Sequence, residues 1–294
     1  MVKNLVSKAP LTSPVLLYNR TQSRATTLAQ TLGPTSATVA PTLSAAITPS
    51  SIIFLCLGDD AAVEQTLDTA ITTTSLAGKL FVDCSTVHPD MTRKVERLLE
   101  SHGASFVACP VFGAPAMADA GKLICVLAGK KEAVARVKPY CANVMGRANL
   151  DLSETSSDPG RATMLKVLGN TIIFSMVEAV AEGMVVAEKS GLGTDALHSF
   201  LELMFPGPYV GYSGRMISGD YFTLEEPLFA VDLARKDVRH AIDMAGQVGA
   251  RMKGTELVDE HLKEVKKEKG EKGDIAAIYG VVRKEAGMKF ENKE

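Results

Sequence analysis

Lys166 and Asn170 are the strongest candidates for chemistry in this sequence. Residues four apart share one face of a helix, and the residues around Lys166 are methionine, leucine and valine. An apolar setting solvates an ammonium group poorly, which favours the neutral, proton-accepting amine. Such a lysine can move a proton to or from a substrate oxygen while Asn170 holds that oxygen or a neighbouring group. The alternative is a lysine that extends its charge to water beside a helix-surface asparagine.

The composition is typical of a folded globular protein. The sequence has 294 residues, is 46% apolar and 22% charged, and has a net charge of -2. Its length suits about two domains. The near-neutral balance gives no electrostatic reason to expect nucleic acid or a membrane as a partner, and no run of about 18 apolar residues indicates a membrane span. The five cysteines match no metal-binding spacing, so we interpret them as buried thiols of a reducing compartment and expect no metal.

Short apolar runs alternate with helix-like stretches in the first half of the chain, a pattern typical of a parallel sheet buried on both faces. The runs lie at 14–18, 51–57, 79–84 and 104–111, and the helices between them at 21–32, 60–72 and 88–102. A further strand at 122–128 follows too closely for a helical crossover, so we expect it to be antiparallel. The pattern predicts a doubly wound α/β domain of the Rossmann type over residues 1–153.

Residues 154–294 are expected to form an all-α domain, because strand-like runs vanish there. Helices are predicted at 161–190, 194–205, 228–249, 254–269 and 274–287, and the turn signals of 206–227 predict a loop-rich stretch. The helix at 161–190 contains Lys166 and Asn170, and its apolar character suits burial between partners.

The end of the strand at 14–18 bears on the cofactor. In doubly wound folds the first strand leads into a G-x-G-x-x-G turn, but this sequence begins inside what reads as the first helix, so the first strand is missing. The strand at 14–18 ends in Asn19-Arg20-Thr21 with no acidic residue nearby. An acid at this place binds the ribose 2′-hydroxyl of NAD, whereas an arginine accommodates the 2′-phosphate of NADP. We therefore expect NADP, with NAD as the second option and a merely solvated arginine as the alternative.

These features resemble the β-hydroxyacid dehydrogenase family, which includes 3-hydroxyisobutyrate dehydrogenase and relatives of 6-phosphogluconate dehydrogenase. Residues 160–170 are similar to the family motif G-x-G-x-x-x-K-x-x-x-N, and residues 1–5 to the M-A-x-N-L that follows its glycine turn. The resemblance covers nearly the whole chain and implies that Lys166 is a general acid/base. Because the glycine turn is absent, we expect weak cofactor binding by this sequence, and we expect the intact gene product to contain the turn.

The resemblance implies further cofactor-binding residues in the first half. Leu57 and Gly58 follow a strand at the place where the family has a loop near the cofactor. Residues 83–89 are similar to the family's D-x-S-T-x-x-P. Ser85 and Thr86 of this stretch would then lie near the nicotinamide, and Ser85 also near the substrate, unless they only cap the helix that follows.

The substrate side departs from the family pattern. Phe112, Gly113 and Ala114 occupy the place of the S-G-G that holds the substrate carboxylate, and a phenyl ring cannot donate a hydrogen bond. A bulkier or less polar substrate is therefore expected. Lys236 lies in a stretch similar to the family's K-D-L, which implies that it approaches the cofactor or substrate, with Asp237 as an orienting neighbour.

The function implied is NADP(H)-dependent hydride transfer to or from a small carbonyl or hydroxyacid compound. The alternative is a non-catalytic pseudo-dehydrogenase that serves as a binding or scaffold module with impaired cofactor binding. Arg215 is either a partner for a substrate carboxylate or a surface residue. The resemblance also implies a homodimer or homotetramer, and a cytoplasmic location is expected, with the mitochondrion as the alternative.

Overall fold

The computed structural model describes residues 1–293, and the chain divides into two compact units between Lys166 and Val167. This division falls inside the long helix α8 (Gly160–Lys189). The boundary predicted between residues 153 and 154 lies earlier, between strand β8 (Gly146–Asp151) and the start of α8. The first turns of α8 belong to the first unit because Ala162 and Leu165 pack into its core.

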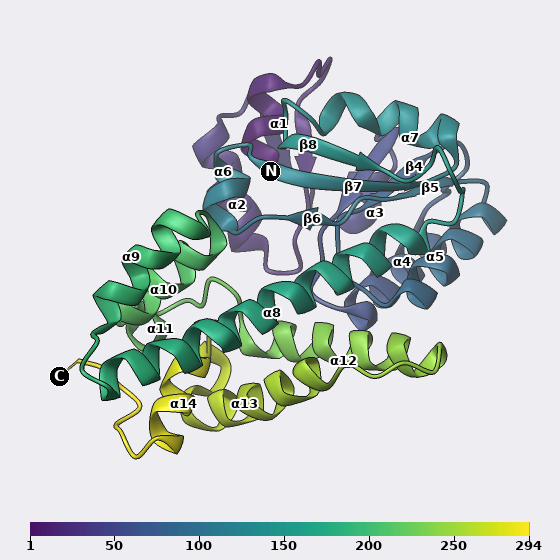
Figure 1. The fold of residues 1–294 in the computed structure, drawn as a ribbon. Helices are drawn as coiled ribbons and strands as arrows, with labels where there is room; N and C mark the ends of the chain where they lie inside the picture. The colour runs from purple at the N-terminus through teal and green to yellow at the C-terminus, as the bar shows by residue number, and fades with distance from the viewer. Residues whose placement is uncertain (294) are drawn as a thin grey trace. The chain divides into compact units, whose positions relative to one another are not determined.

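The first unit has the strand–helix alternation that the apolar runs predict (Figure 1). Its strands are β1 (Val15–Leu17), β2 (Ala37–Val39), β3 (Ile52–Leu55), β4 (Leu80–Asp83), β5 (Ser105–Ala108), β6 (Val111–Phe112), β7 (Leu123–Gly129) and β8. Its helices are α1 (Val2–Lys8), α2 (Gln22–Leu32), α3 (Leu43–Ile47), α4 (Asp60–Thr73), α5 (Pro89–Ser101), α6 (Pro115–Asp119), α7 (Lys131–Val137) and the 3-10 turn η1 (Lys138–Tyr140).

The larger sheet has the order β3-β4-β5-β7-β6, with β8 paired to β7. Strands β3, β4 and β5 are parallel, and β7 runs antiparallel to β5, as predicted for the strand at 122–128. Successive residues alternate between two cores. Phe81 and Phe106 face the side covered by α3, α4 and α5, whereas Val82 and Val107 face the side of α1 and α7 (Figure 1). Helices thus cover both faces, which explains why the strands are apolar throughout.

Strands β1 and β2 form a separate parallel pair, with Val15 opposite Ala37. Within residues 1–293, no strand joins this pair to β3, which is an edge of the larger sheet. In the usual doubly wound order the first strand lies between the strands that β1 and β3 represent. The break in strand pairing between β1 and β3 thus lies at the position that the first strand has in that order.

The second unit is all-α, as predicted. After the remainder of α8 it contains α9 (Thr194–Met204), α10 (Pro208–Ser218), α11 (Asp220–Thr223), α12 (Val231–Gln247), α13 (Lys253–Lys269) and α14 (Ile278–Glu285), with the 3-10 turns η2 (Gly270–Lys272) and η3 (Ile275–Ala277). Its core joins α8 to α12, α13 and α14 through fully buried residues such as Val177, Ala234 and Leu262. Apolar residues of α8 such as Val177, Val180 and Ala181 thus pack within this unit.

The loop-rich stretch predicted at 206–227 is wrong, because two helices, α10 and α11, lie there. Pro208 occupies the first turn of α10, where a proline begins a helix without losing a hydrogen bond. Gly219, with a φ of 86°, separates the two helices. Met216 and Tyr221 are buried, so packing against the core outweighs the turn signals of the sequence.

Helix α8 is long and apolar enough to cross a membrane by length and composition, although its sequence has no uninterrupted run of about 18 apolar residues. Half of its most apolar window is buried inside the protein. The core helix of a folded domain meets the same criteria, and the packing of Val177 and Ala181 is of that kind.

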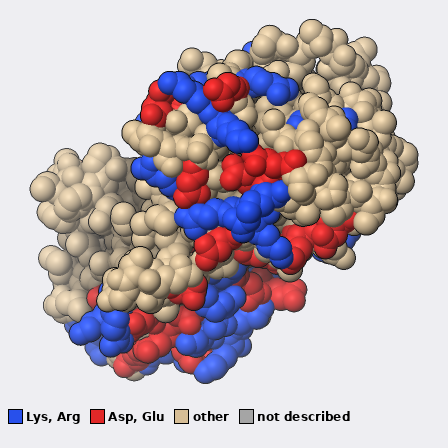
Figure 2. Space-filling view, turned by 90° about the vertical axis from the view of Figure 1, so that its right-hand side faces the viewer, with Lys and Arg blue, Asp and Glu red and all other residues tan. Residues whose placement is uncertain are grey.

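Charged side chains of both signs are interspersed on the face drawn in Figure 2, without an extended patch of one sign there. Ion pairs of the first unit include Lys130 with Glu100 and Lys131 with Glu154, each at 2.6 Å between nitrogen and oxygen. Exposed ion pairs of this kind contribute little to stability because water screens them, so we assign them no role in fixing the fold.

A buried pair in the second unit predicts a pH-dependent stability. His261 Nδ1 lies 2.7 Å from Glu178 Oε1, and His261 Nε2 lies 3.3 Å from Glu285 Oε1. The hydrogen bond to Glu178 raises the pKa of His261 above its unfolded value. The stability that it contributes is therefore complete below the unfolded pKa of about 6.5 and is lost as the pH rises through the folded pKa.

The variant His261→Gln tests this effect by thermal denaturation. The Tm of the wild type should exceed that of the variant most at low pH, and the difference should shrink as the pH rises from about 6 to 9. The variant His102→Gln, at the exposed end of α5, should show no such trend. A difference for His261→Gln that does not change with pH would contradict the assignment.

Candidate active site

Two loops at the carboxyl ends of β3 and β4 lie side by side in the first unit. The backbone N–H of Leu57 donates a hydrogen bond of 2.8 Å to Ser85 Oγ, and the N–H of Ser85 donates one of 2.9 Å to Asp83 Oδ1. Asp83 and Ser85 are both buried, which fixes the shape of the second loop. The structure thus brings together two predicted cofactor residues, with Gly58 and Thr86 next to them in the chain. Ligands bind at this edge of open α/β sheets.

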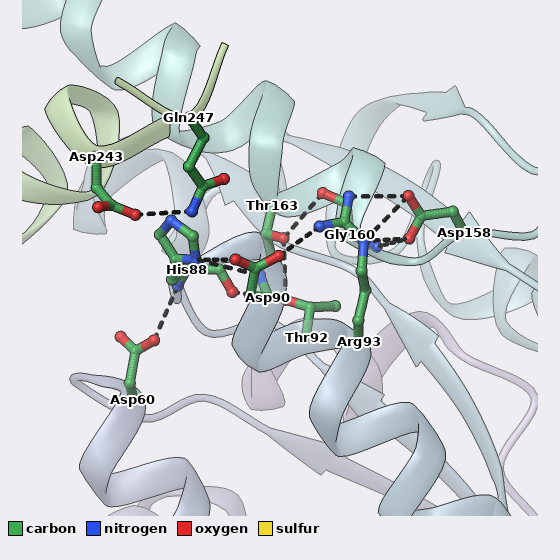
Figure 3. A network of polar contacts seen from close by, with 10 residues as sticks. All are labelled: Asp60, His88, Asp90, Thr92, Arg93, Asp158, Gly160, Thr163, Asp243 and Gln247. Carbon is green, nitrogen blue, oxygen red and sulfur yellow. Dashed lines mark hydrogen bonds and ion pairs between the residues drawn. The ribbon is translucent and has the colours of Figure 1, made fainter. Parts of the chain in front are cut away.

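The helix after the second loop is not capped by Ser85 or Thr86, which was the alternative for these residues. The N-cap of α5 is His88, whose Nδ1 accepts a hydrogen bond of 3.2 Å from the N–H of Asp90. The N–H of His88 in turn donates to Asp60 Oδ1 at 3.0 Å (Figure 3). His88 thus has a structural role that its sequence context did not reveal.

Polar contacts with α5 hold the beginning of α8 in place (Figure 3). Arg93 donates hydrogen bonds of 3.0 Å from Nε and Nη2 to the carboxylate of Asp158, which also accepts one of 2.9 Å from the N–H of Gly160. The hydroxyls of Thr92 and Thr163 lie 2.9 Å apart. A Cβ at position 160 would approach Arg93 Nε to 2.8 Å, so a larger residue there would displace the Arg93 guanidinium from its place beside Asp158. The network fixes the helical turn directly before Lys166.

Lys166 is nearly buried, with 9% of its surface exposed. Its Nζ lies over the ring of Phe112, 4.4 Å from the centroid. An ammonium at this position is attracted by the face of the ring, by about 2 kcal/mol where water is excluded. The structure therefore brings the predicted catalytic lysine together with the residue that replaces the family serine. It also places Lys166 in a defined position, which argues against a lysine that extends into water.

The backbone conformation after Phe112 requires a glycine at position 113. Gly113 has a φ of 135°, and a Cβ there would lie 2.7 Å from Leu123 Cδ2. Ala114 follows as the N-cap of the short helix α6 and makes no side-chain cap. Any polar contact that this stretch makes with a substrate must come from the backbone, since none of the three side chains can donate a hydrogen bond.

In the second unit Asp237 contacts both remaining candidates from that half of the chain. Asn170 Nδ2 donates a hydrogen bond of 2.6 Å to Asp237 Oδ2, and Lys236 Nζ lies 3.3 Å from Asp237 Oδ1. All three residues are buried. The contact between Asp237 and Lys236 is what we expect if Asp237 orients the Lys236 side chain. The sequence did not predict the hydrogen bond between Asn170 and Asp237. The available signal was that Asp237 directly follows the candidate residue Lys236.

Arg215 is engaged within the second unit. Its guanidinium forms an ion pair with the buried carboxylate of Asp274 and lies over the ring of Tyr212, 5.2 Å from the centroid. Asp274 also accepts hydrogen bonds of 2.9 and 2.8 Å from the N–H groups of Phe229 and Ala276. The ion pair with Asp274 therefore gives Arg215 a structural role in place of contact with a substrate carboxylate.

The sequence is similar to known dehydrogenases along both units. Residues 1–151 match the model for the NAD binding domain of 6-phosphogluconate dehydrogenase, and residues 160–282 match the model described as NAD-binding of NADP-dependent 3-hydroxyisobutyrate dehydrogenase. The NADH-dependent oxidoreductase ucdB of Aspergillus ustus is 38% identical over 291 residues, which cover 99% of this chain and 97% of that protein. The chain belongs to the β-hydroxyacid dehydrogenase family.

Solved structures share the fold of this family member. The 3-hydroxyisobutyrate dehydrogenase ygbJ of Salmonella typhimurium has a TM-score of 0.81 at 17% identity, with 95% of this chain and 94% of that one covered. Psf3, in a complex with NADP+ and 2-OPP, has a TM-score of 0.79 at 22% identity, with 96% and 95% covered. These two structures show the shared fold. The family models and the relative ucdB identify the chain as an NAD(P)-binding oxidoreductase that acts on CH–OH groups.

The residues of this β-hydroxyacid dehydrogenase fit part of a nicotinamide dinucleotide. Asn19, Arg20 and Thr21 are exposed directly after β1, and the N–H of Thr21 donates a hydrogen bond of 2.8 Å to Asn19 Oδ1, which shapes the turn. The N–H groups of the exposed Arg20 guanidinium suit a ribose hydroxyl or a phosphate as hydrogen-bond acceptor. The loops of Leu57 and Ser85 suit the nicotinamide side. The glycine turn that would hold the pyrophosphate is not found in residues 1–293.

Proposed function

We propose that the protein transfers hydride between a nicotinamide cofactor and a small carbonyl or hydroxy compound, with Lys166 as general acid/base. The observation that supports this most directly is the position of Lys166, nearly buried and held over Phe112 on a helix whose start is fixed by Arg93 and Asp158. Family membership supplies the reaction class. The loops of Leu57 and Ser85 would hold the nicotinamide end of the cofactor.

The cofactor, when bound, supplies or accepts the hydride, and the protein must then manage one proton. In the reducing direction the Lys166 ammonium donates a proton to the substrate oxygen and becomes a neutral amine. In the oxidising direction the neutral amine accepts the proton of the hydroxyl. Asn170, one helical turn further along α8, is the proposed second group at that oxygen, with its amide oriented by Asp237.

The proposed substrate is less polar or bulkier than the small hydroxyacids of the family. Phe112 offers a ring where a hydroxyl would hold a carboxylate, and this ring already contacts Lys166. Gly113 and Ala114 leave only backbone N–H groups as donors. We therefore expect aldehydes, ketones and their alcohols to outperform small carboxylic acids in a screen for NAD(P)H oxidation, and a clear preference for the acids would contradict this.

For the cofactor we propose NADP, with NAD as the second option. Arg20 is exposed at the end of β1 with no acidic residue beside it in the sequence, a setting that suits a 2′-phosphate. The name of the relative ucdB, which is NADH-dependent, favours the opposite choice. The variant Arg20→Ala separates the two. If NADP is the cofactor, this variant should lower the affinity for NADPH by about tenfold or more and leave the affinity for NADH unchanged, because one charge-assisted contact contributes about 1.5–3 kcal/mol.

Cofactor fluorescence titration is the matching experiment, and the nearby Arg24→Ala on α2 is the control for a general loss of positive charge. Equal losses for both cofactors in Arg20→Ala would contradict a phosphate contact. The same titration tests the enzyme proposal itself, when it is repeated with the chain preceded by a strand and a G-x-G-x-x-G turn. Binding should be weak for the present sequence and restored by the addition. Failure of both forms would favour the non-catalytic alternative.

We further propose that the protein works as a homodimer or homotetramer. Ile172 and Val186 on α8 and Leu203 on α9 are 72%, 66% and 89% exposed, although all three are large apolar residues. Exposed apolar residues that form one patch mark surfaces that pack against another chain, and these three residues are the candidates for such a patch. Light scattering should give a multiple of the chain mass, and Leu203→Glu should lower it. A single-chain mass for the wild type would contradict the proposal.

A further inference from the structure

Three cysteines that are distant in sequence meet in the core of the first unit. Cys109 follows β5, Cys125 lies within β7 and Cys141 follows η1. Their sulfur atoms all lie within 4.8 Å of one another, and those of Cys109 and Cys141 are 4.0 Å apart. All three residues are 0% exposed. None of them belongs to the loops or helices that the proposed reaction uses.

We propose that Cys109, Cys125 and Cys141 form a binding site for a thiophilic, three-coordinate ion, for which trivalent arsenic is the matching probe. Sulfur ligands lie about 2.3 Å from a bound ion, and trivalent arsenic, which keeps a lone pair, binds three sulfurs as a pyramid with sulfur–sulfur separations of roughly 3.5 Å. The sulfurs of Cys109 and Cys141 are 4.0 Å apart, and all three lie within 4.8 Å of one another. Side-chain rotations must therefore draw the three sulfurs closer together, by about 0.5 Å for Cys109 and Cys141.

The surroundings of the three sulfurs favour a bound complex that has no net charge. The neighbouring side chains are apolar, with Val107, Val134 and Leu127 fully buried in the same core cluster. An uncompensated charge in such a place is strongly unfavourable. Three thiolates around a divalent ion retain one negative charge, whereas three around trivalent arsenic are neutral. The environment therefore favours a trivalent ion over zinc.

The binding step is a ligand exchange without oxidation or reduction. Arsenite, As(OH)₃, gives up three hydroxyl groups as three As–S bonds replace three As–O bonds. Each thiol proton leaves with one hydroxyl as water, so atoms and charge balance.

We expect access to the buried site at η1. Cys141 lies at the end of this short 3-10 turn and not within a strand. Local opening of η1 would expose its sulfur without breaking a pair of strands in the sheet, and such openings cost less than global unfolding. Loading of the folded protein should therefore be slow but should not require denaturant.

Cys84 and Cys56 provide matched controls. Cys84 is buried in the same core cluster but lies outside the set of three, and Cys56 is exposed. After incubation with arsenite and removal of the excess, native mass spectrometry of the wild type should show the gain of one arsenic and the loss of three hydrogens. Arsenic X-ray absorption should show three sulfur neighbours. The variants Cys84→Ala and Cys56→Ala should give the same results.

The variant Cys125→Ala should lose at least about 100-fold in arsenite affinity, because removal of a ligand costs more than the loss of a supporting contact. Circular dichroism checks that this variant is folded, and Cys141→Ala replaces it if it is not. Wild-type affinity in either folded variant, fewer than three sulfur neighbours, or loss of binding in Cys84→Ala would each overturn the proposal. Zinc bound more tightly than arsenite, with four sulfur neighbours, would also overturn it.

Discussion

Replacement of Lys166 by methionine is expected to lower kcat by about 10²–10⁴-fold, the usual contribution of a general acid/base. Methionine keeps the length of the side chain and can contact the ring of Phe112 through its sulfur. The packing of the start of α8 should therefore survive, because it depends on Arg93, Asp158 and the pair of threonine hydroxyls. What the variant loses is the proton that the substrate oxygen needs.

The affinity for the cofactor should remain unchanged in Lys166→Met, and this separates catalysis from folding. Steady-state turnover with the best carbonyl compound of the screen gives kcat, and fluorescence titration gives the cofactor affinity of the same preparation. The matched control is Lys94→Met, which removes an exposed lysine paired with Glu64 on the surface and should leave both values unchanged. If titration of Lys166 gives the wild-type kcat a pH dependence, that dependence should be absent from the residual kcat of Lys166→Met.

A kcat for Lys166→Met within tenfold of the wild type would exclude the lysine as the proton donor. The non-catalytic alternative predicts a different result, in which neither the wild type nor any variant turns over a carbonyl compound. The two outcomes are distinguishable because the first requires measurable wild-type activity.

The sequence was sufficient to predict the larger elements of the fold because their patterns are local. The apolar runs that became β3, β4, β5 and β7 are continuous, and the second half contains long helical stretches. Short elements were missed. Strand β2 has only three residues, Ala37–Val39, and its place is fixed by pairing with β1 and not by any pattern of its own. At 206–227 the burial of Tyr221 outweighed a sequence rich in turn residues.

Candidate site residues were predictable where a motif spans one element, as for Lys166 and Asn170 on α8. Contacts between distant segments were not. The stacking of Lys166 on Phe112 and the hydrogen bond from Asn170 to Asp237, 67 residues away, depend on tertiary packing that no spacing encodes. The thiol cluster was missed for the same reason, because each of its cysteines comes from a different element.

The largest loss of stability is expected from Asp274→Ala in the second unit. The carboxylate of Asp274 accepts hydrogen bonds from the N–H groups of Phe229 and Ala276 and forms the ion pair with Arg215. Its removal leaves two backbone donors without their partner and a guanidinium that is only 13% exposed without its counter-charge. Breaking a buried ion pair by removal of one partner costs about 3–5 kcal/mol, so the free energy of unfolding should fall by that amount.

Urea denaturation followed by circular dichroism measures this loss. Asp232→Ala is the matched control, because Asp232 pairs with Lys266 at 2.6 Å on the surface, and it should cost less than about 1 kcal/mol. The double variant Asp274→Ala with Arg215→Met should recover part of the loss, since the guanidinium is then no longer buried alone. The part that is not recovered measures the two backbone hydrogen bonds. A cost for Asp274→Ala equal to that of Asp232→Ala would mean that Arg215 finds water or another partner, which would make it available again as a ligand-binding residue.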